Sequence, residues 1–201
     1  MIRVVIAEDQ KLLRGALASL LSLEEDIEVV AEAEDGHTAW QAIRRLAPDL
    51  CLLDIELPGL SGLEVAERIK TEGLSSKIII LTTFARAGFL QKAMTLNVEG
   101  YLLKDEPIDV VIDSIRKVMT GKRVLSTDLA AVLFMKEQNP LTEREAEVLR
   151  LSRSGLTTRE IANTLHLTEG TVRNYLSLAI QKLGVETRQQ ATEEAYRRGW
   201  I

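Results

Sequence analysis

The feature that most constrains the fold is a series of short apolar segments, each followed by a stretch with helical periodicity. Five such segments occupy the first half of the chain: 2–7, 28–33, 50–53, 77–82 and 100–103. Strands that are apolar along most of their length are buried on both faces, as in a parallel sheet covered by helices. The alternation therefore predicts an α/β domain with a doubly wound, five-stranded parallel sheet.

The pattern changes near Gly121, after which the strand signal fades. Four helical segments with short connections follow, at 142–153, 158–165, 169–183 and 188–198, and a further short helix is expected at 128–136 before Pro140. We therefore expect an α/β domain at 1–122, a linker at 123–139 and an all-α domain at 140–201.

Composition narrows the class of protein. No apolar run is long enough to cross a bilayer and the start of the chain does not resemble a signal peptide, so we expect a cytoplasmic protein that is not a membrane protein. The single cysteine, Cys51, cannot form a disulfide within the chain and is expected to be a buried thiol. The formal charge is −5, and most of the acidic excess lies in the first half.

Carboxylates stand at the ends of two predicted strands. Glu8 and Asp9 follow the first strand, and Asp54 follows the third. Two like charges 4 Å apart repel by about 4 kcal/mol at an effective dielectric constant near 20, so a close grouping would need a neutralising partner. A hard cation such as Mg²⁺ is suited to this task. The alternative is that these acids cap their strands and face water separately.

Two further polar side chains stand at the ends of predicted strands. Thr82 ends the fourth strand and offers a hydroxyl, and Lys104 follows the fifth and offers a fixed positive charge. A nucleophilic carboxylate, a cation site, a hydroxyl donor and an ammonium group are together what phosphoryl transfer to an aspartate requires. The first half therefore favours a phosphoacceptor site around Asp54.

Four motifs in this half resemble the receiver domain of two-component response regulators: "AED" at 7–9, "LLDIELPGLSGLE" at 52–64, "ILTTF" at 80–84 and "GYLLKD" at 100–105. The resemblance implies a flavodoxin-like fold and a phosphoryl group transferred to Asp54 by a sensor histidine kinase. It implies that Asp9, Asp54 and the backbone carbonyl of Glu56 bind Mg²⁺ with help from Glu8. It also implies that Lys104 contacts the phosphate and that Thr82 and Tyr101 form the switch pair.

The chain departs from the receiver pattern at two places. Asp105 follows Lys104 where many receivers have proline, and Thr83 stands where alanine or glycine is common. Thr83, Glu56 and Phe84 would flank the phosphoacceptor, and we hypothesise that they set the lifetime of the acyl phosphate.

The stretch "LTTREIANTLHLTEGTVRNYLSLAIQKLGV", at 156–185, divides into a helix, a turn around His166 and a longer helix. Thr168 is a plausible N-cap of the longer helix, whose outer face carries Arg173, Asn174 and Ser177. Such a helix suits the major groove of DNA. A helical hairpin that only packs against its neighbours is the alternative.

The stretch from Leu141 to Arg188 resembles the four-helix output domain of the LuxR, NarL and FixJ class of regulators, through "LTEREAEVLRL", "REIA", "TV" and "KLGV". The resemblance implies that Arg173, Asn174 and Ser177 face bases or phosphates and that Thr168, Thr171 and Lys182 are candidates for the DNA backbone. The final helix matches the one that this class uses for dimerisation. A narrower likeness in "GTVRNYLSLAIQKLG" and "YRRGWI" suggests the promoter of a membrane-lipid desaturase gene as the target.

Together the two resemblances imply a response regulator that dimerises on phosphorylation, binds promoter DNA and regulates transcription. RNA polymerase is a candidate partner, and no enzymatic activity is expected beyond Mg²⁺-dependent phosphorylation and dephosphorylation of the chain itself. Two alternatives stay open: an aspartyl phosphatase that uses Asp54 and Glu56 in a D-x-E arrangement, and an adaptor that binds only proteins.

Overall fold

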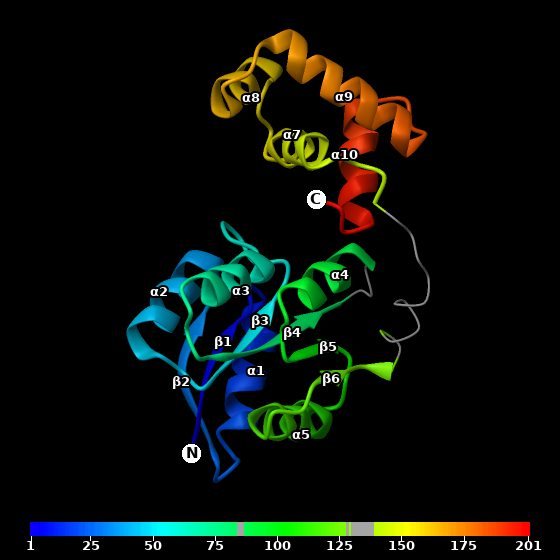
Figure 1. Cartoon of the computed structure of the whole chain (residues 1–201). Coiled ribbons are helices and arrows are strands. Elements are labelled where there is room, and N and C mark those ends of the chain that lie inside the picture. Colours follow the sequence, from blue (N-terminus) through cyan, green and yellow to red (C-terminus); the bar gives the residue numbers. More distant parts are fainter. Residues whose placement is uncertain (84–86, 128, 130–138) are drawn as a thin grey trace. The chain divides into compact units, whose positions relative to one another are not determined.

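The computed structural model describes residues 1–83, 87–127, 129 and 139–201 (Figure 1). Phe84 and nearly all of the helix expected at 128–136 lie outside the described residues. The chain divides into two compact units, which are described separately. The first holds the sheet, helices α1, α2, α3 and α5 and most of α4, and the second holds helices α7 to α10.

A single parallel sheet forms the centre of the first unit. Its strands lie in the order β2-β1-β3-β4-β5-β6 and span β1 Ile2–Ala7, β2 Ile27–Ala33, β3 Leu50–Asp54, β4 Lys77–Thr82, β5 Gly100–Leu103 and β6 Val124–Leu125. Five of these strands match the prediction. The sixth, β6, corrects the expected count. It pairs with β5 through two residues, too few to produce a periodic signal in the sequence.

Helices cover both faces of this sheet. The helices α1 (Lys11–Leu21) and α5 (Ile108–Met119) pack on one face, where Leu17, Leu21 and Ile115 join the strand side chains in the core. The helices α2 (Gly36–Leu46), α3 (Gly62–Thr71) and α4 (Ala87–Thr95) lie on the other face (Figure 1). The doubly wound architecture is therefore present as expected.

Two sequence features place the start of α3 next to the end of β3, at the carboxyl edge of the sheet. Ser61 caps α3 in a capping box with Glu64. Just inside this helix, a Cβ atom on Gly62 would lie 2.0 Å from the carbonyl oxygen of Asp54. Glycine is needed there because only a residue without a side chain lets the helix start approach the end of β3 so closely.

The second unit is all-α. Its helices are α7 (Glu143–Arg153), α8 (Thr158–Leu165), α9 (Glu169–Leu183) and α10 (Arg188–Arg197), and their bounds lie within a residue of the prediction. Capping boxes begin α7, α8 and α10. The core contains Val148, Leu149, Ile161, Val172 and further small apolar side chains from all four helices. Among the described helices, none is long and apolar enough to cross a membrane.

Candidate functional site

The predicted acidic cluster forms at the carboxyl edge of the sheet. β1 and β3 are neighbours in register, with Ala7 beside Leu53, so Glu8, Asp9 and Asp54 follow at the same edge. Their nearest carboxylate oxygens all lie within 4.8 Å of one another. Glu8 and Asp54 are buried, at 0% and 2% exposure, whereas Asp9 is exposed. Glu8 and Asp54 therefore do not face water separately, whereas Asp9 is exposed at the edge of the same cluster.

Lys104 joins the cluster from the end of β5. Its backbone N–H donates to the carbonyl of Thr82 at 2.8 Å, which holds the residue beside β4. Its Nζ lies 2.8 Å from an oxygen of Glu8 and 2.9 Å from an oxygen of Asp54, and all three side chains are at most 7% exposed. One buried cation thus faces two buried carboxylates, with Asp9 close by.

Burial dominates the titration of this group. It raises the pKa of Glu8 and of Asp54 above their ordinary values, although contact with Lys104 opposes the rise in both. Burial alone would lower the pKa of Lys104, but its bonds to the two carboxylates outweigh burial and raise it. The two buried carboxyls are therefore harder to ionise than exposed ones, even though an ammonium contacts both.

The donor set fits a hard divalent cation. The Oε2 atom of Glu8 and the Oδ2 atom of Asp54 are buried, and neither has a donor in hydrogen-bonding geometry, although the Lys104 ammonium lies at ion-pairing distance. The carboxylate of Asp9 makes no hydrogen bond or ion pair with the described residues. Buried oxygens without an aligned donor are costly, and a cation would satisfy them.

The other predicted receiver residues surround the cluster. Thr82 is the last residue of β4, one position beyond Leu81, which pairs in register with Asp54. Tyr101 lies on the neighbouring strand and is buried, as is Thr82. Glu56 and Thr83 are exposed near the same edge. The switch pair of Thr82 and Tyr101 stays a prediction.

Arg14 is a residue of this site that the sequence reading missed. From the second turn of α1 its guanidinium donates to the carbonyl oxygens of Glu8, at 2.6 Å, and Asp9, at 3.3 Å. It also lies 3.9 Å from a carboxylate oxygen of Glu32 and 3.6 Å from one of Glu34. The sequence does contain one indication of this role: an arginine stands one turn into the helix that follows Glu8 and Asp9.

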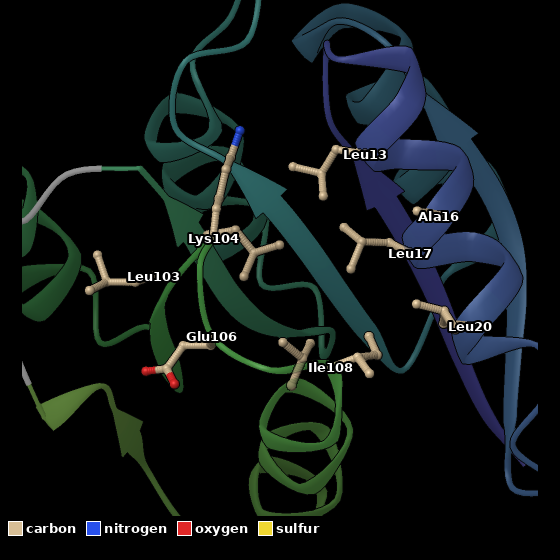
Figure 2. A pocket seen from close by; sticks show the side chains of 10 residues that line it. Leu13, Ala16, Leu17, Leu20, Leu103, Lys104, Glu106 and Ile108 are labelled. Carbon is tan, nitrogen blue, oxygen red and sulfur yellow. The ribbon is translucent and has the colours of Figure 1, made fainter.

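An apolar pocket of about 140 Å³ lies between α1 and α5, next to Lys104. Figure 2 shows Leu13 and Leu17 pointing into it from α1 and Ile108 from the start of α5. Around this pocket, Leu12 and Leu20 of α1 are 88% and 40% exposed, whereas Ile115 of α5 is fully buried. Only some of the apolar side chains of α1 and α5 are therefore available for an interface.

The predicted helix-turn-helix is present in the second unit. His166 ends α8 in the left-handed conformation, and the Thr168 hydroxyl caps α9 by accepting from the N–H of Thr171. Arg173, Asn174 and Ser177 are all exposed on α9. Their placement suits contact with a DNA groove.

Two of the predicted DNA contacts have partners within this unit. A guanidinium nitrogen of Arg173 lies 2.8 Å from a carboxylate oxygen of Glu169, in an exposed pair one turn apart. The Nζ of Lys182 lies 2.7 Å from a carboxylate oxygen of Glu145, whose side chain is 3% exposed. Burial alone would raise the pKa of Glu145, but its bonds with Lys182 and Thr142 lower it. Lys182 therefore ties α9 to the start of α7.

Other sequence expectations agree with the structure. Cys51 is a buried free thiol whose pKa burial raises to about 12, so it is not a reactive nucleophile.

The two units define a class: an aspartate-centred signal-receiving domain combined with a helix-turn-helix DNA-binding domain. Family models agree, with the response regulator receiver domain matching residues 4–116 and the bacterial regulatory proteins of the luxR family matching residues 139–195. The chain belongs to the response regulators with a LuxR-type DNA-binding domain, and it is a transcriptional regulator. This membership favours the regulator over the phosphatase and the adaptor.

Individual relatives match along the whole chain. The uncharacterized transcriptional regulatory protein YvfU of Bacillus subtilis strain 168 is 52% identical over 201 residues, covering 100% of both chains. The transcriptional regulatory protein DesR of the same organism is 49% identical, again over 100% of both. A solved structure of the response regulator RcsB in complex with DNA is 26% identical, covers 98% of each chain and has a TM-score of 0.66.

Proposed function

We propose that a sensor histidine kinase phosphorylates Asp54 and that the phosphorylated chain dimerises on promoter DNA. The observation that carries this proposal is the meeting of buried Asp54 with Glu8, Asp9 and Lys104 in a chain that also holds a DNA-binding domain. We assign residues 1–122 to the receiver, 123–139 to the linker and 140–201 to the DNA-binding domain. We place the protein in the cytoplasm, where its DNA target is accessible.

In the phosphotransfer step, a carboxylate oxygen of Asp54 attacks the phosphorus of a phosphohistidine on the kinase. The oxygen–phosphorus bond forms as the nitrogen–phosphorus bond breaks, and the histidine nitrogen keeps the bonding electrons. Lys104 is placed to offset charge on the phosphoryl oxygens. Mg²⁺ held by Asp9, Asp54 and the carbonyl of Glu56, with Glu8 nearby, would add positive charge at the same oxygens.

Thr82 and Tyr101 carry the switch in this proposal. The Thr82 hydroxyl would donate to a phosphoryl oxygen. The resulting shift of the end of β4 would displace the side chain of Tyr101 on the neighbouring strand β5. A phosphoryl group adds up to two negative charges and three acceptor oxygens, enough to reorganise nearby donors. Beyond its own phosphorylation and dephosphorylation, we assign the chain no catalytic activity.

For the dimer, we propose a second copy of the chain packed on the α1 and α5 face. The exposed Leu20 on the rim of the apolar pocket supports this placement. Leu20→Asp should block phosphorylation-dependent dimerisation but leave phosphorylation intact. Leu23→Asp is the matched control, because Leu23 is exposed but does not line the pocket.

On DNA, the dimer would present two α9 helices to half-sites about 10 base pairs apart. Thr168, Thr171 and Lys182 are proposed for the DNA backbone, and Arg173, Asn174 and Ser177 for bases or phosphates. The promoter of a membrane-lipid desaturase gene stays a candidate target, which binding to that promoter against an unrelated one would check. RNA polymerase stays a candidate partner.

The decisive experiment treats the parent chain and Asp54→Asn with acetyl phosphate and Mg²⁺. We expect the parent to gain the mass of one phosphoryl group, to shift to a dimer in gel filtration and to bind promoter DNA more tightly. Asp54→Asn should show none of these changes. If the variant responds like the parent, Asp54 is not the phosphoacceptor.

A further inference from the structure

We propose that Arg14 is a positioning residue for the metal site: it fixes the backbone of Glu8 and Asp9 so that their carboxylates are held ready for Mg²⁺. The inference deepens the proposed function, since it assumes that this site binds Mg²⁺. It concerns a residue that contacts neither the metal nor the phosphoryl group.

The first step concerns how the loop between β1 and α1 is held. The N-cap of α1 is Gln10, whose side chain makes no capping hydrogen bond. By contrast, α2 and α3 are capped by Asp35 and Ser61. The Arg14 guanidinium instead ties α1 to this loop by donating to the carbonyl oxygens of Glu8 and Asp9. A rigid guanidinium that reaches two acceptors restrains the loop more than a single hydrogen bond would.

The second step concerns Asp9. Its exposed carboxylate has no partner among the described residues, so no side-chain contact orients it. The orientation of this ligand therefore depends on the backbone, and its carbonyl is one of the two groups that Arg14 holds. Groups that orient a metal ligand from outside the coordination shell typically change metal affinity by about 10- to 100-fold when removed.

The contact is also well sheltered. The Arg14 side chain is only 13% exposed, whereas the Glu32 and Glu34 side chains that it approaches are 45% and 75% exposed. Those two ion pairs are long and screened by water, so they contribute little. The hydrogen bonds to the two carbonyls are therefore the contacts that matter for the site.

A simple charge argument predicts the opposite sign, which makes the inference testable. Arg14 is a cation beside the loop that carries Glu8 and Asp9, so its removal would by Coulomb's law alone strengthen Mg²⁺ binding. If positioning dominates, its removal must weaken binding. The direction of the change in dissociation constant thus decides between the two effects.

The experiment titrates Mg²⁺ into the full-length chain by calorimetry, for the parent, Arg14→Gln, Arg14→Lys and Arg3→Gln. Arg3 is a matched control because its guanidinium also donates to two backbone carbonyls, those of Leu46 and Ala47, in the segment before β3 and away from the acidic cluster. Urea unfolding of each variant measures the stability cost separately.

We expect Arg14→Gln to weaken Mg²⁺ binding about tenfold or more. Arg14→Lys should recover part of the loss, because lysine keeps the charge and a donor but carries it on a more flexible side chain than the planar guanidinium. Arg3→Gln should lower stability and leave Mg²⁺ affinity unchanged. Unchanged or tighter binding by Arg14→Gln overturns the inference, as does an equal loss of affinity in Arg3→Gln. Absence of Mg²⁺ binding by the parent would instead refute the proposed metal site itself.

Discussion

Replacing Lys104 with methionine tests how the buried charges of the site are balanced. The Lys104 ammonium lies 2.8 and 2.9 Å from oxygens of Glu8 and Asp54. At these distances each contact corresponds to about 6 kcal/mol of attraction at an effective dielectric constant of 20. The cost of desolvating the ammonium offsets much of this, and removing one partner of a buried pair typically costs about 3–5 kcal/mol. We expect Lys104→Met to lose stability in that range at neutral pH without Mg²⁺.

The loss should depend on pH and on Mg²⁺. Burial already raises the pKa of both carboxyls in the parent, and removal of the cation raises them further. A carboxyl whose pKa is raised by folding stabilises the native state below its unfolded pKa, and that stability is lost as the pH rises through the folded pKa. The defect of Lys104→Met should therefore shrink as the pH falls from neutral toward the ordinary titration range of a carboxyl, and shrink again when Mg²⁺ is added.

Urea unfolding followed by tryptophan fluorescence provides the assay. Trp40 lies in the receiver and Trp200 in the DNA-binding domain, so a Trp200→Phe background reports the receiver alone. Lys117→Met is the control, because Lys117 pairs with Asp113 on the exposed surface of α5 and its loss should cost about 0.5 kcal/mol or less. Equal midpoints for Lys104→Met and its parent, without Mg²⁺ at neutral pH, would refute the charge balance described here.

Three further outcomes follow from the same contacts. Asp54→Asn removes a buried carboxylate with a raised pKa, so without Mg²⁺ it should stabilise the receiver at neutral pH and flatten the dependence of unfolding free energy on pH, measured by urea titration at several pH values. Arg173→Ala should reduce discrimination between operator and unrelated DNA by about 1–3 kcal/mol in competition binding if the contact is bidentate to guanine. Lys182→Met leaves the buried carboxylate of Glu145 without its ammonium partner, so the urea midpoint of unfolding, reported by Trp200 fluorescence, should fall. The slope of log binding constant against log salt concentration for DNA should fall by about 1 only if Lys182 also contacts a phosphate.

Much of the fold could be predicted because strands that are buried on both faces consist almost entirely of apolar residues. Strands such as β3 and β4 are apolar along nearly their whole length, and parallel pairing brings their carboxyl ends to one edge. That geometry is sufficient to predict from the sequence alone that Asp54, Glu8 and Lys104 lie together. The strand β6 escaped notice because its pairing with β5 depends on where the chain returns, which two residues do not reveal.

Two contacts that the sequence did not reveal join a long polar side chain of one helix to another part of the same unit. Arg14 reaches the β1–α1 loop, and Lys182 reaches the start of α7, because of helix positions that only the packed core determines. A reading of periodicity tells which face of a helix is buried, but it does not say which carbonyl or carboxylate a long polar side chain will meet. Residue roles of this kind require the folded structure.

Helix α1 offers a physical route from the phosphoacceptor site to the proposed dimer face. Arg14 fastens one side of this helix to the backbone of Glu8 and Asp9, while the adjacent Leu13 and, one turn on, Leu17 line the apolar pocket that Lys104 borders. One turn of a helix is stiff. A shift of the loop that carries Glu8 and Asp9, transmitted through Arg14, would therefore also displace Leu13 and Leu17 in the wall of the pocket. The pocket also borders Lys104, whose ammonium would be drawn toward a phosphoryl group on Asp54. A charge added at Asp54 can therefore reach the apolar face through two short contacts, without any long-range rearrangement of the sheet.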